Sequence, residues 1–159
     1  MEDISLHILD IVENSVRALA TRIKIKIDEN IEEDWLTIEI LDNGQGMDEV
    51  TIKKALDPFF TSKITGRIGL GLPLLHQAAR ETGGELKISS EAGKKTKVRA
   101  TFRYSHPDRK PLGNIKETLL VLAAGYTEVD FVYEHRRKNR TYRWDSKRVE
   151  DKKNVRPNH

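Results

Sequence analysis

Strict alternation of apolar and polar residues in two neighbouring segments is the feature that most constrains the fold of this chain. Residues 22–28 (RIKIKID) and 35–42 (WLTIEILD) each place an Ile or Leu at every second position, which puts these side chains on one side of an extended backbone. A sheet built from such strands has one apolar face, and helices must cover that face because it would otherwise contact water. The sequence therefore predicts an α+β fold with two layers, a sheet and the helices that cover one of its faces.

Apolar residues spaced by three and four positions predict the helices. Residues 3–21 carry Ile, Val and Leu at this spacing, and Asp48 is a residue type that caps a helix beginning after it. Glycines at positions 83 and 84 would end the helix that precedes them. The predicted helices span residues 3–21, 48–56, 72–82 and 112–125, and the further strands span residues 85–91, 97–104, 128–135 and 140–144.

Residues 105–111 (SHPDRKP) interrupt these patterns with two prolines. We place a boundary there: residues 1–105 form the main domain, and residues 106–159 form a helix plus β-hairpin extension with a basic tail. Residues 135–159 hold ten Lys and Arg against three Asp and Glu, whereas the whole chain has a net charge of +3. A basic tail can contact nucleic acid or an acidic partner, but most such runs are solvated, so we do not expect nucleic acid as a partner.

Composition excludes several classes of protein. With 37% hydrophobic and 33% charged residues over 159 positions, the chain can bury a core and differs from a disordered polymer. The sequence contains no cysteine, which excludes disulfides, thiolate metal sites and cysteine nucleophiles. No apolar run approaches the roughly 20 residues of a membrane-spanning helix, and the acidic N-terminus differs from a signal peptide. We therefore expect a cytoplasmic protein without membrane contacts.

Two glycine motifs stand at the ends of predicted elements. Residues 41–47 (LDNGQGM) follow a strand, and residues 69–72 (GLGL) open a helix. Paired glycines let a backbone approach a ligand closely, and a helix N-terminus offers free N–H groups to a phosphate. The second motif lacks the Gly-Lys-Ser/Thr of a P-loop and the spacing of a dinucleotide-binding fingerprint. Together the two motifs predict a phosphate-bearing ligand.

Four motifs follow one another along the chain: DIVENSVRA (residues 10–18), DNGQGM (42–47), DPFFTSK (57–63) and GLGL (69–72). In this order they resemble the ATP-binding domain of the GHKL superfamily of gyrases, heat-shock chaperones, histidine kinases and MutL. The resemblance covers residues 4–104 and is strongest to the histidine-kinase catalytic domain, although ENSVRALATRIKIKI (residues 13–27) also resembles the MutL branch. It implies the Bergerat ATP-binding fold, which is a two-layer α/β sandwich with a mixed, mostly antiparallel sheet and helices on one face, and it implies ATP and Mg²⁺ as ligands.

The resemblance assigns recognition of the base to the end of the second predicted strand. Asp42 would accept a hydrogen bond from the exocyclic amine of adenine, and a buried carboxylate needs such a partner. Thr96 matches the family position whose hydroxyl assists that aspartate, usually through water. Gly44, Gly46 and Met47 would shape the base pocket. The alternative is that Asp42 only caps a turn.

Three residues on one stripe of the first predicted helix are assigned to the phosphate end of the ligand. Asn14 would hold Mg²⁺, because its amide oxygen is a hard neutral ligand. Arg17 matches a basic residue that contacts phosphates in the kinase branch. Asp10 lies one turn before Asn14, where ATPase branches carry a glutamate that positions the attacking water, so Asp10 is the candidate catalytic general base. Its shorter side chain leaves a metal-side or structural role as the alternative.

The remaining candidates lie in and after the predicted loop. Lys63 is a candidate phosphate contact, Phe60 would close over the base or anchor the loop, and Arg67 is interpreted as a solvated cation. The second glycine motif would contribute four nucleotide contacts: Gly69, Leu70, Gly71 and Leu72. His7 and His76 lack the sequence context of a phosphoacceptor histidine, so both are interpreted as packing or surface residues.

Three functions are compatible with these residues. The first, which we expect, is a stand-alone kinase-type ATP module that acts on a separate protein substrate or regulator, since no phosphoacceptor helix precedes the ATP-binding motifs. The second is an ATP-hydrolysing switch of MutL or gyrase type, whose nucleotide state controls a partner or a homodimer. The third is a binding module that nucleotide stabilises, with the basic tail recruiting an acidic partner or nucleic acid.

Overall fold

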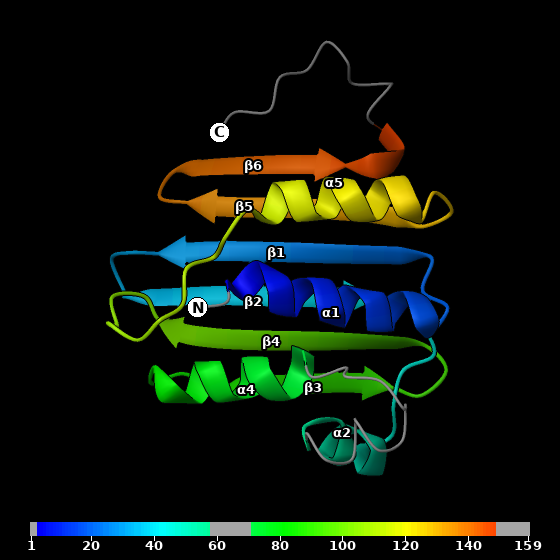
Figure 1. Ribbon diagram of the computed structural model, residues 1–159, viewed down its shortest axis with the longest axis horizontal. Coiled ribbons are helices and arrows are strands. Elements are labelled where there is room, and N and C mark those ends of the chain that lie inside the picture. The colour runs from blue at the N-terminus through cyan, green and yellow to red at the C-terminus, as the bar shows by residue number, and fades with distance from the viewer. Residues whose placement is uncertain (1–2, 58–70, 149–159) are drawn as a thin grey trace.

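The computed structural model describes residues 3–57 and 71–148, and six strands within these ranges form one sheet (Figure 1). The order across the sheet is β3-β4-β2-β1-β5-β6. The strands are β1 (Arg22–Asn30), β2 (Trp35–Asp42), β3 (Leu86–Glu91), β4 (Lys95–Arg103), β5 (Asp130–Arg137) and β6 (Arg140–Asp145). Neighbouring strands are antiparallel except β1 and β5, which are parallel. The sheet is mixed and mostly antiparallel, which confirms the prediction.

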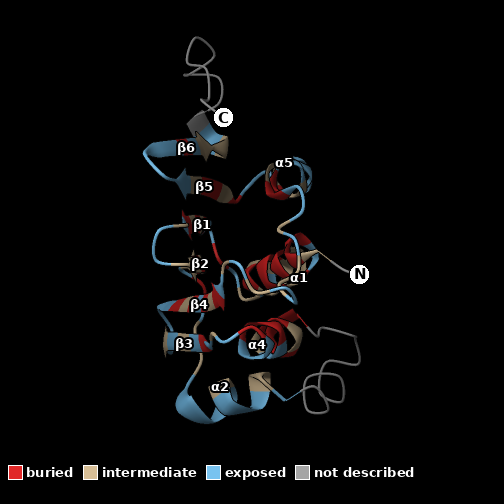
Figure 2. Ribbon diagram, turned by 90° about the vertical axis from the view of Figure 1, so that its left-hand side faces the viewer, coloured by how far each residue is buried: buried red, intermediate tan, exposed pale blue. Residues whose placement is uncertain are grey.

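Three helices cover one face of the sheet: α1 (Ile4–Arg17), α4 (Gly71–Glu81) and α5 (Ile115–Gly125) (Figure 2). The shorter α2 (Glu49–Ala55) lies beyond the β3 edge, and a 3-10 turn (Ser146–Arg148) follows β6. This arrangement is the two-layer α+β sandwich that the alternating strands predicted. None of the helices in the described ranges is long and apolar enough to cross a membrane.

The core lies between the helices and the sheet. Ile25 stands opposite Ile40, and Ile27 stands opposite Ile38, so the alternating positions of β1 and β2 form one continuous apolar surface. These four side chains are at most 1% exposed. Burying an aliphatic side chain of this size contributes about 1.5–3 kcal/mol, and the alternation is therefore sufficient to decide which face of the sheet the helices cover.

The opposite face of the sheet carries charged side chains. Glu39 on β2 lies within 3.9 Å of Lys26, 3.4 Å of Lys97 and 3.3 Å of Arg99, which come from the strands on its two sides. Half-exposed pairs of this kind contribute about 0–1 kcal/mol each. Their main effect is to keep this face hydrated.

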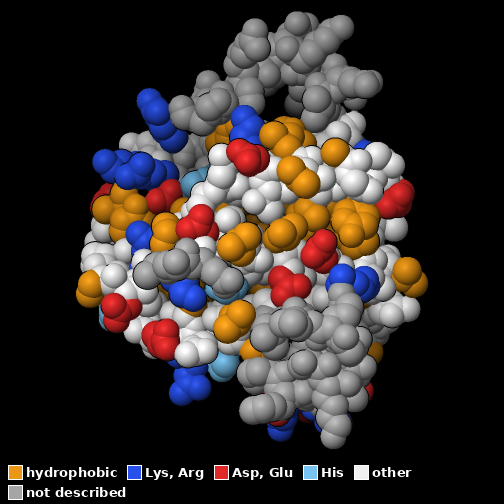
Figure 3. Space-filling view, viewed as in Figure 1, with side chains coloured by type: hydrophobic (Ala, Val, Ile, Leu, Met, Phe, Trp, Pro, Cys, Tyr) orange, Lys and Arg blue, Asp and Glu red, His pale blue; other side chains and the backbone are white. Residues whose placement is uncertain are grey.

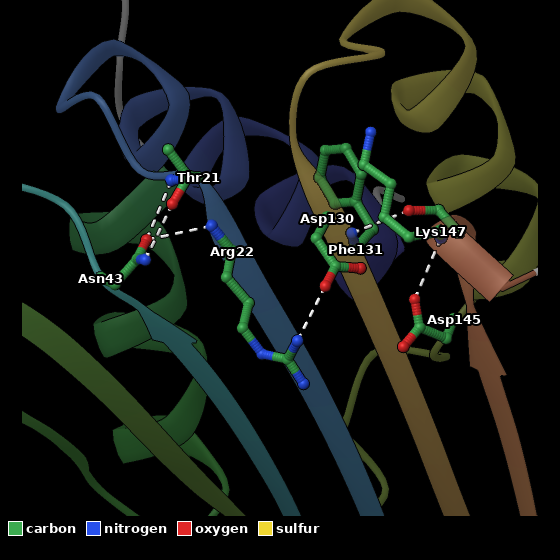
Figure 4. A network of polar contacts seen from close by, with 8 residues as sticks. Thr21, Arg22, Asn43, Asp130, Phe131, Asp145 and Lys147 are labelled. Carbon is green, nitrogen blue, oxygen red and sulfur yellow. Dashed lines mark hydrogen bonds and ion pairs between the residues drawn. The ribbon is translucent and has the colours of Figure 1, made fainter.

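The C-terminal helix and hairpin form where they were predicted, and the hairpin continues the sheet. Strand β5 pairs with β1 from Arg22 opposite Asp130 to Glu29 opposite Arg137. The Arg22 Nη1 atom lies 2.7 Å from Asp130 Oδ2, and the Phe131 N–H donates to Ser146 Oγ at 2.9 Å (Figure 4). The division of the chain at residue 105 stays a prediction, although the strands on its two sides share one sheet.

Candidate functional site

Asp42 is the last residue of β2, and its side chain lies on the helix-covered side of the sheet, next to Ile23 of β1 and Thr96 of β4. The Ser15 hydroxyl donates to Asp42 Oδ2 at 2.7 Å, and the Gly44 N–H donates to Asp42 Oδ1 at 2.9 Å. Each carboxylate oxygen still has a lone pair for another donor. The bond from the Gly44 N–H gives Asp42 a role in capping the turn, which the sequence left open as an alternative. The bond from the Ser15 hydroxyl in addition orients the carboxylate toward α1.

Thr96 is 8% exposed and stands directly opposite Asp42 on β4. Its hydroxyl oxygen lies 2.8 Å from Ser90 Oγ, which also accepts from the Met47 N–H at 2.7 Å. The single hydroxyl hydrogen of Ser90 is directed to the Lys95 carbonyl oxygen at 2.8 Å. Thr96 must therefore donate its own hydrogen to Ser90, and its oxygen keeps only acceptor sites. Asp42 and Thr96 thus present acceptors side by side.

The glycines of the DNGQGM motif permit close backbone contacts. A Cβ at Gly44 would lie 2.8 Å from the Ala18 carbonyl oxygen, and Gly46 has φ +72° with its α-carbon against the Glu91 backbone. The Gln45 N–H donates to the same Ala18 oxygen at 2.9 Å. These contacts clamp the loop between the end of α1 and the β3–β4 turn, so side chains are excluded here for packing reasons. A role of both glycines and of Met47 in shaping a base pocket stays a prediction.

Asn43 fixes the same loop to the start of β1. Its Oδ1 accepts from the N–H groups of Thr21 and Arg22 at 2.9 and 3.0 Å, and its Nδ2 donates to the Thr21 hydroxyl at 2.9 Å (Figure 4). The loop therefore leaves β2 in a fixed direction, which holds the residues around Asp42 in place.

Asn14 and Arg17 contact each other on α1, as their spacing predicted. The Arg17 Nη1–H donates to Asn14 Oδ1 at 3.0 Å. Asn14 is half-buried and Arg17 is exposed. Among the described residues, no group of three or more His, Cys, Asp or Glu could hold a metal ion. A Mg²⁺ at Asn14 would therefore draw its other ligands from water and phosphate, which fits the coordination habits of this ion.

Asp10 connects α1 to the first residue of α4. The Gly71 N–H donates to Asp10 Oδ2 at 2.7 Å. A Cβ at Gly71 would lie 2.9 Å from Asp10 Cβ and 3.1 Å from the His7 carbonyl oxygen, so only glycine allows this approach. The bond gives Asp10 the structural role that the sequence left open as an alternative. Its assignment as a general base stays a prediction.

Some of the other candidate residues lie within the described ranges, and the rest lie outside them. Leu72 is 9% exposed and belongs to the hydrophobic core, so its side chain has a packing role. His7 is buried and His76 is half-buried, in keeping with the packing interpretation. Burial, and next the charge of Arg80, lower the pKa of His76 below its ordinary value. The remaining predicted residues lie outside the described ranges: Phe60, Lys63, Arg67, Gly69 and Leu70.

Sequence reasoning missed three residues that hold the site together: Ser15, Asn43 and Ser90. Ser15 had a detectable signal, because it is a polar residue on the apolar stripe of a helix and is 6% exposed. Asn43 and Ser90 are common loop and strand residues, and the bonds that tie them to the DNGQGM loop or to the start of β1 join residues 21 to 43 positions apart. No spacing rule connects residues that far apart.

Known proteins resemble about the N-terminal two thirds of this chain. The profile of a family described as histidine kinase-, DNA gyrase B-, and HSP90-like ATPase matches residues 2–106. Relatives include the signal transduction histidine-protein kinase AtoS of Escherichia coli (38% identical over 108 residues), the sensor protein kinase FleS of Pseudomonas aeruginosa (37% over 89) and sporulation kinase C of Bacillus subtilis (35% over 86). These alignments cover 67%, 56% and 54% of this chain but 17%, 22% and 20% of the relatives, so the chain spans about a fifth of their length.

Proposed function

The chain belongs to the family of histidine kinase-, DNA gyrase B- and HSP90-like ATPases, and from this premise we propose that it is a Mg²⁺- and ATP-dependent kinase module that acts on a separate partner protein. Its ATP-binding domain is of the histidine-kinase-like type. The names of the three relatives above describe kinases, which favours phosphoryl transfer over hydrolysis as the outcome of ATP binding. The partner would supply the side chain that accepts the phosphoryl group.

The pair of acceptors formed by Asp42 and Thr96 is the observation that carries this proposal. A primary amine on a purine ring has two hydrogens to donate, and adenine differs from guanine in presenting such an amine at the position where guanine has a carbonyl oxygen. A site that offers only acceptors binds the amine and rejects the carbonyl, because two acceptors facing each other would leave both without a donor. The site therefore favours ATP over GTP.

The residues of α1 fit the opposite end of the nucleotide. Asn14 offers an oxygen to Mg²⁺, and the ion would supply positive charge to the phosphates of bound ATP. In the structure Arg17 occupies that oxygen at 3.0 Å. Binding of the ion would therefore release the Arg17 guanidinium, which could then pair with a phosphate oxygen of the same nucleotide.

A second candidate function is the ATP-hydrolysing switch, and Asp10 is the observation that favours it. Asp10 lies one helical turn from Asn14, where a carboxylate can activate a water molecule near the terminal phosphate. Its bond to Gly71 would at the same time transmit the state of the nucleotide to α4. Under this alternative the protein would hydrolyse ATP without a partner.

The test uses purified full-length protein with Mg²⁺ and γ-labelled ATP, and follows ATP affinity, released phosphate and label retained on protein. Asp42→Asn replaces one acceptor oxygen with a donor and should weaken ATP binding more than about tenfold. Asp28→Asn is the matched control, because Asp28 lies on the other face of the sheet, opposite Thr37, and carries the same charge.

The results separate the proposals. Tight Asp42-dependent binding with little phosphate release supports the partner-dependent kinase. Steady phosphate release that Asp42→Asn abolishes supports the switch. Equal ATP affinity in the wild type and Asp42→Asn would reject the nucleotide site itself.

A further inference from the structure

A cavity of about 880 Å³ lies at the opposite end of the sheet from Asp42. Glu29, near the end of β1, lines it, whereas Asp42 pairs with Ile23 near the start of the same strand. Six residues of extended chain separate Glu29 from Ile23, which corresponds to roughly 20 Å. The volume is in the range of small-molecule sites, about 300–1,000 Å³. The cavity is therefore distinct from the nucleotide site and large enough for a ligand of its own.

Aromatic and aliphatic side chains form part of the cavity wall. Tyr133 of β5 and Tyr142 of β6 line it, with their rings packed edge to face at a centroid distance of 5.7 Å. Both are at most 7% exposed, and Leu112 and Ile115 lie on the α5 side of the same cavity. Such a wall suits a flat, apolar ring, because aromatic groups favour edge and offset contacts with one another.

Glu29 is the one carboxylate among the described residues of the lining, and it already has partners within the protein. Tyr104 Oη donates to Glu29 Oε1 at 2.8 Å, and His135 Nε2 lies 2.5 Å from Glu29 Oε2. The other ring nitrogen of His135 lies 2.8 Å from the Tyr133 hydroxyl, which completes a chain of buried polar contacts. Burial, and next the hydrogen bond to Glu29, raise the pKa of Tyr104 above its ordinary value, so its phenol stays a donor. Glu29 is thereby compensated and does not repel an anion as a free carboxylate would.

Cations line the rest of the cavity. Arg137 ends β5, Lys138 lies in the turn after it, Arg140 begins β6, and Lys116 lies in the first turn of α5. Figure 3 shows Lys and Arg side chains gathered at this end of the molecule. The Lys116 Nζ atom lies 5.1 Å from the centre of the Tyr142 ring. The Arg137 Nε atom lies 3.9 Å from Glu29 Oε1, so three further cations line the cavity beside this ion pair and the positive end of the α5 dipole.

We propose that this cavity binds a small organic anion that joins a planar ring to a phosphate or carboxylate group. The ring would pack on Tyr133 and Tyr142, and the anionic group would pair with Lys116 and Arg140. Such a ligand would contact both the tyrosines and the cations. An inorganic ion would contact only the cations, and a neutral ring would contact only the tyrosines. A phosphate ester and a carboxylic acid share the required chemistry, and the experiment below distinguishes them.

The test titrates the ¹⁵N-labelled full-length protein with 1-naphthyl phosphate, 1-naphthoate, 1-naphthol and inorganic phosphate, and follows backbone amide resonances. We expect saturable shifts at Gly113, Asn114 and Lys138 with one or both naphthyl anions, and at least about tenfold weaker binding of naphthol and of inorganic phosphate. The stronger of the two naphthyl anions identifies the preferred acid group.

Two variants of one strand serve as the matched pair. Arg140→Gln removes a cation that lines the cavity, and Arg143→Gln removes one that pairs with Glu134 at 3.0 Å and does not line it. Arg140→Gln should weaken binding about tenfold, which is the effect of losing one charged hydrogen bond, whereas Arg143→Gln should leave the affinity unchanged. Equal losses in both variants would show a general charge effect and overturn the proposal.

The same titration repeated on Asp42→Asn shows whether the probe binds in the cavity or at the nucleotide site. An unchanged affinity for the naphthyl anion supports a separate site. Resonance shifts confined to the residues around Asp42, and lost in Asp42→Asn, would mean that the probe occupies the nucleotide site and that the cavity at Glu29 is empty. Failure of ATP to bind would reject the proposed function without affecting this result.

Discussion

At the scale of single residues, Ser15 is the side chain on which the orientation of Asp42 depends. Its hydroxyl is 6% exposed and donates to Asp42 at 2.7 Å across the gap between α1 and β2. The half-buried Asp42 carboxylate, if it lost this donor, would rotate toward its remaining donor, the Gly44 N–H. Ser15 therefore positions the acceptor that the nucleotide would use, without being expected to contact the nucleotide itself.

Replacing Ser15 with alanine tests this positioning role. We expect Ser15→Ala to weaken ATP binding about tenfold or more, since one buried hydrogen bond to a charged group contributes about 1.5 kcal/mol or more. Isothermal titration calorimetry with Mg²⁺ and ATP measures the change. Ser5→Ala is the control, because Ser5 is also buried in α1, at 5% exposed, but lies ten positions from Ser15. An equal effect of both substitutions would show that α1 is merely destabilised.

At the scale of secondary-structure elements, the contact between α1 and α4 depends on one glycine and one carboxylate. Gly71 leaves room for Asp10, and its N–H is one of the donors that a helix cannot satisfy internally at its N-terminus. Asp10 satisfies it and adds a negative charge where the helix dipole favours one. The start of α4 is therefore fixed to the helix that carries Asn14.

Two substitutions of Asp10 separate this structural role from catalysis. Asp10→Asn keeps an oxygen acceptor for the Gly71 N–H but cannot act as a base, whereas Asp10→Ala removes both. If Asp10 is a general base, phosphate release should fall at least about 100-fold in both variants, with ATP affinity retained in Asp10→Asn. If its role is structural, Asp10→Asn should resemble the wild type, and Asp10→Ala should lose about 1 kcal/mol of folding free energy in urea unfolding.

At the scale of the whole molecule, the single sheet crosses the predicted domain boundary. Ile115, Leu119, Leu122 and Phe131 all follow residue 105, and each is at most 4% exposed. Their burial against the helix-covered face corresponds to on the order of 10 kcal/mol, which is comparable to the total stability of a domain. The N-terminal part thus depends on the C-terminal part for its core and for one neighbour of β1.

A truncated chain tests this dependence. We expect a protein of residues 1–105 to aggregate or to lack cooperative thermal unfolding, because β1 would present an unpaired edge next to uncovered apolar side chains. Circular dichroism and size-exclusion chromatography measure the outcome. A soluble, cooperatively folded fragment that still binds ATP would establish residues 1–105 as an independent domain, as the sequence predicted.

Local patterns were sufficient to predict most elements of the fold. The strands β1 and β2 could be predicted from alternation alone, because apolar and polar residues at alternate positions show which face of each strand is buried. The Thr51 N–H donates to Asp48 Oδ1 at 2.8 Å, which confirms the predicted cap of α2. The pairing of β5 with β1 could not be predicted in this way, because alternation says which face is buried but not which strand is the neighbour.

The candidate site, too, could be predicted from the sequence only in part. Asp42 and Thr96 could be selected from motifs, and the structure places them on paired positions of β2 and β4. The donor to Asp42 could not be selected, because Ser15 reaches it from a helix 27 positions away, whereas Ser90 faces Thr96 within the β3–β4 hairpin and could have been found from the register of that hairpin. A hydrogen-bond partner such as Ser15 depends on the tertiary structure and leaves no spacing in the sequence.

The parallel pairing of β1 with β5 also has a consequence for the order of folding. Arg22 and Asp130, which pair across these strands, are separated by 108 positions. At roughly 5–20 residues synthesised per second, an emerging β1 would wait about 5–20 s for this neighbour. Contacts between such distant segments also form slowly, because a long loop must close first. The chain therefore pairs β1 with β5 only after the strands that flank β2 and the helices that cover them have been made.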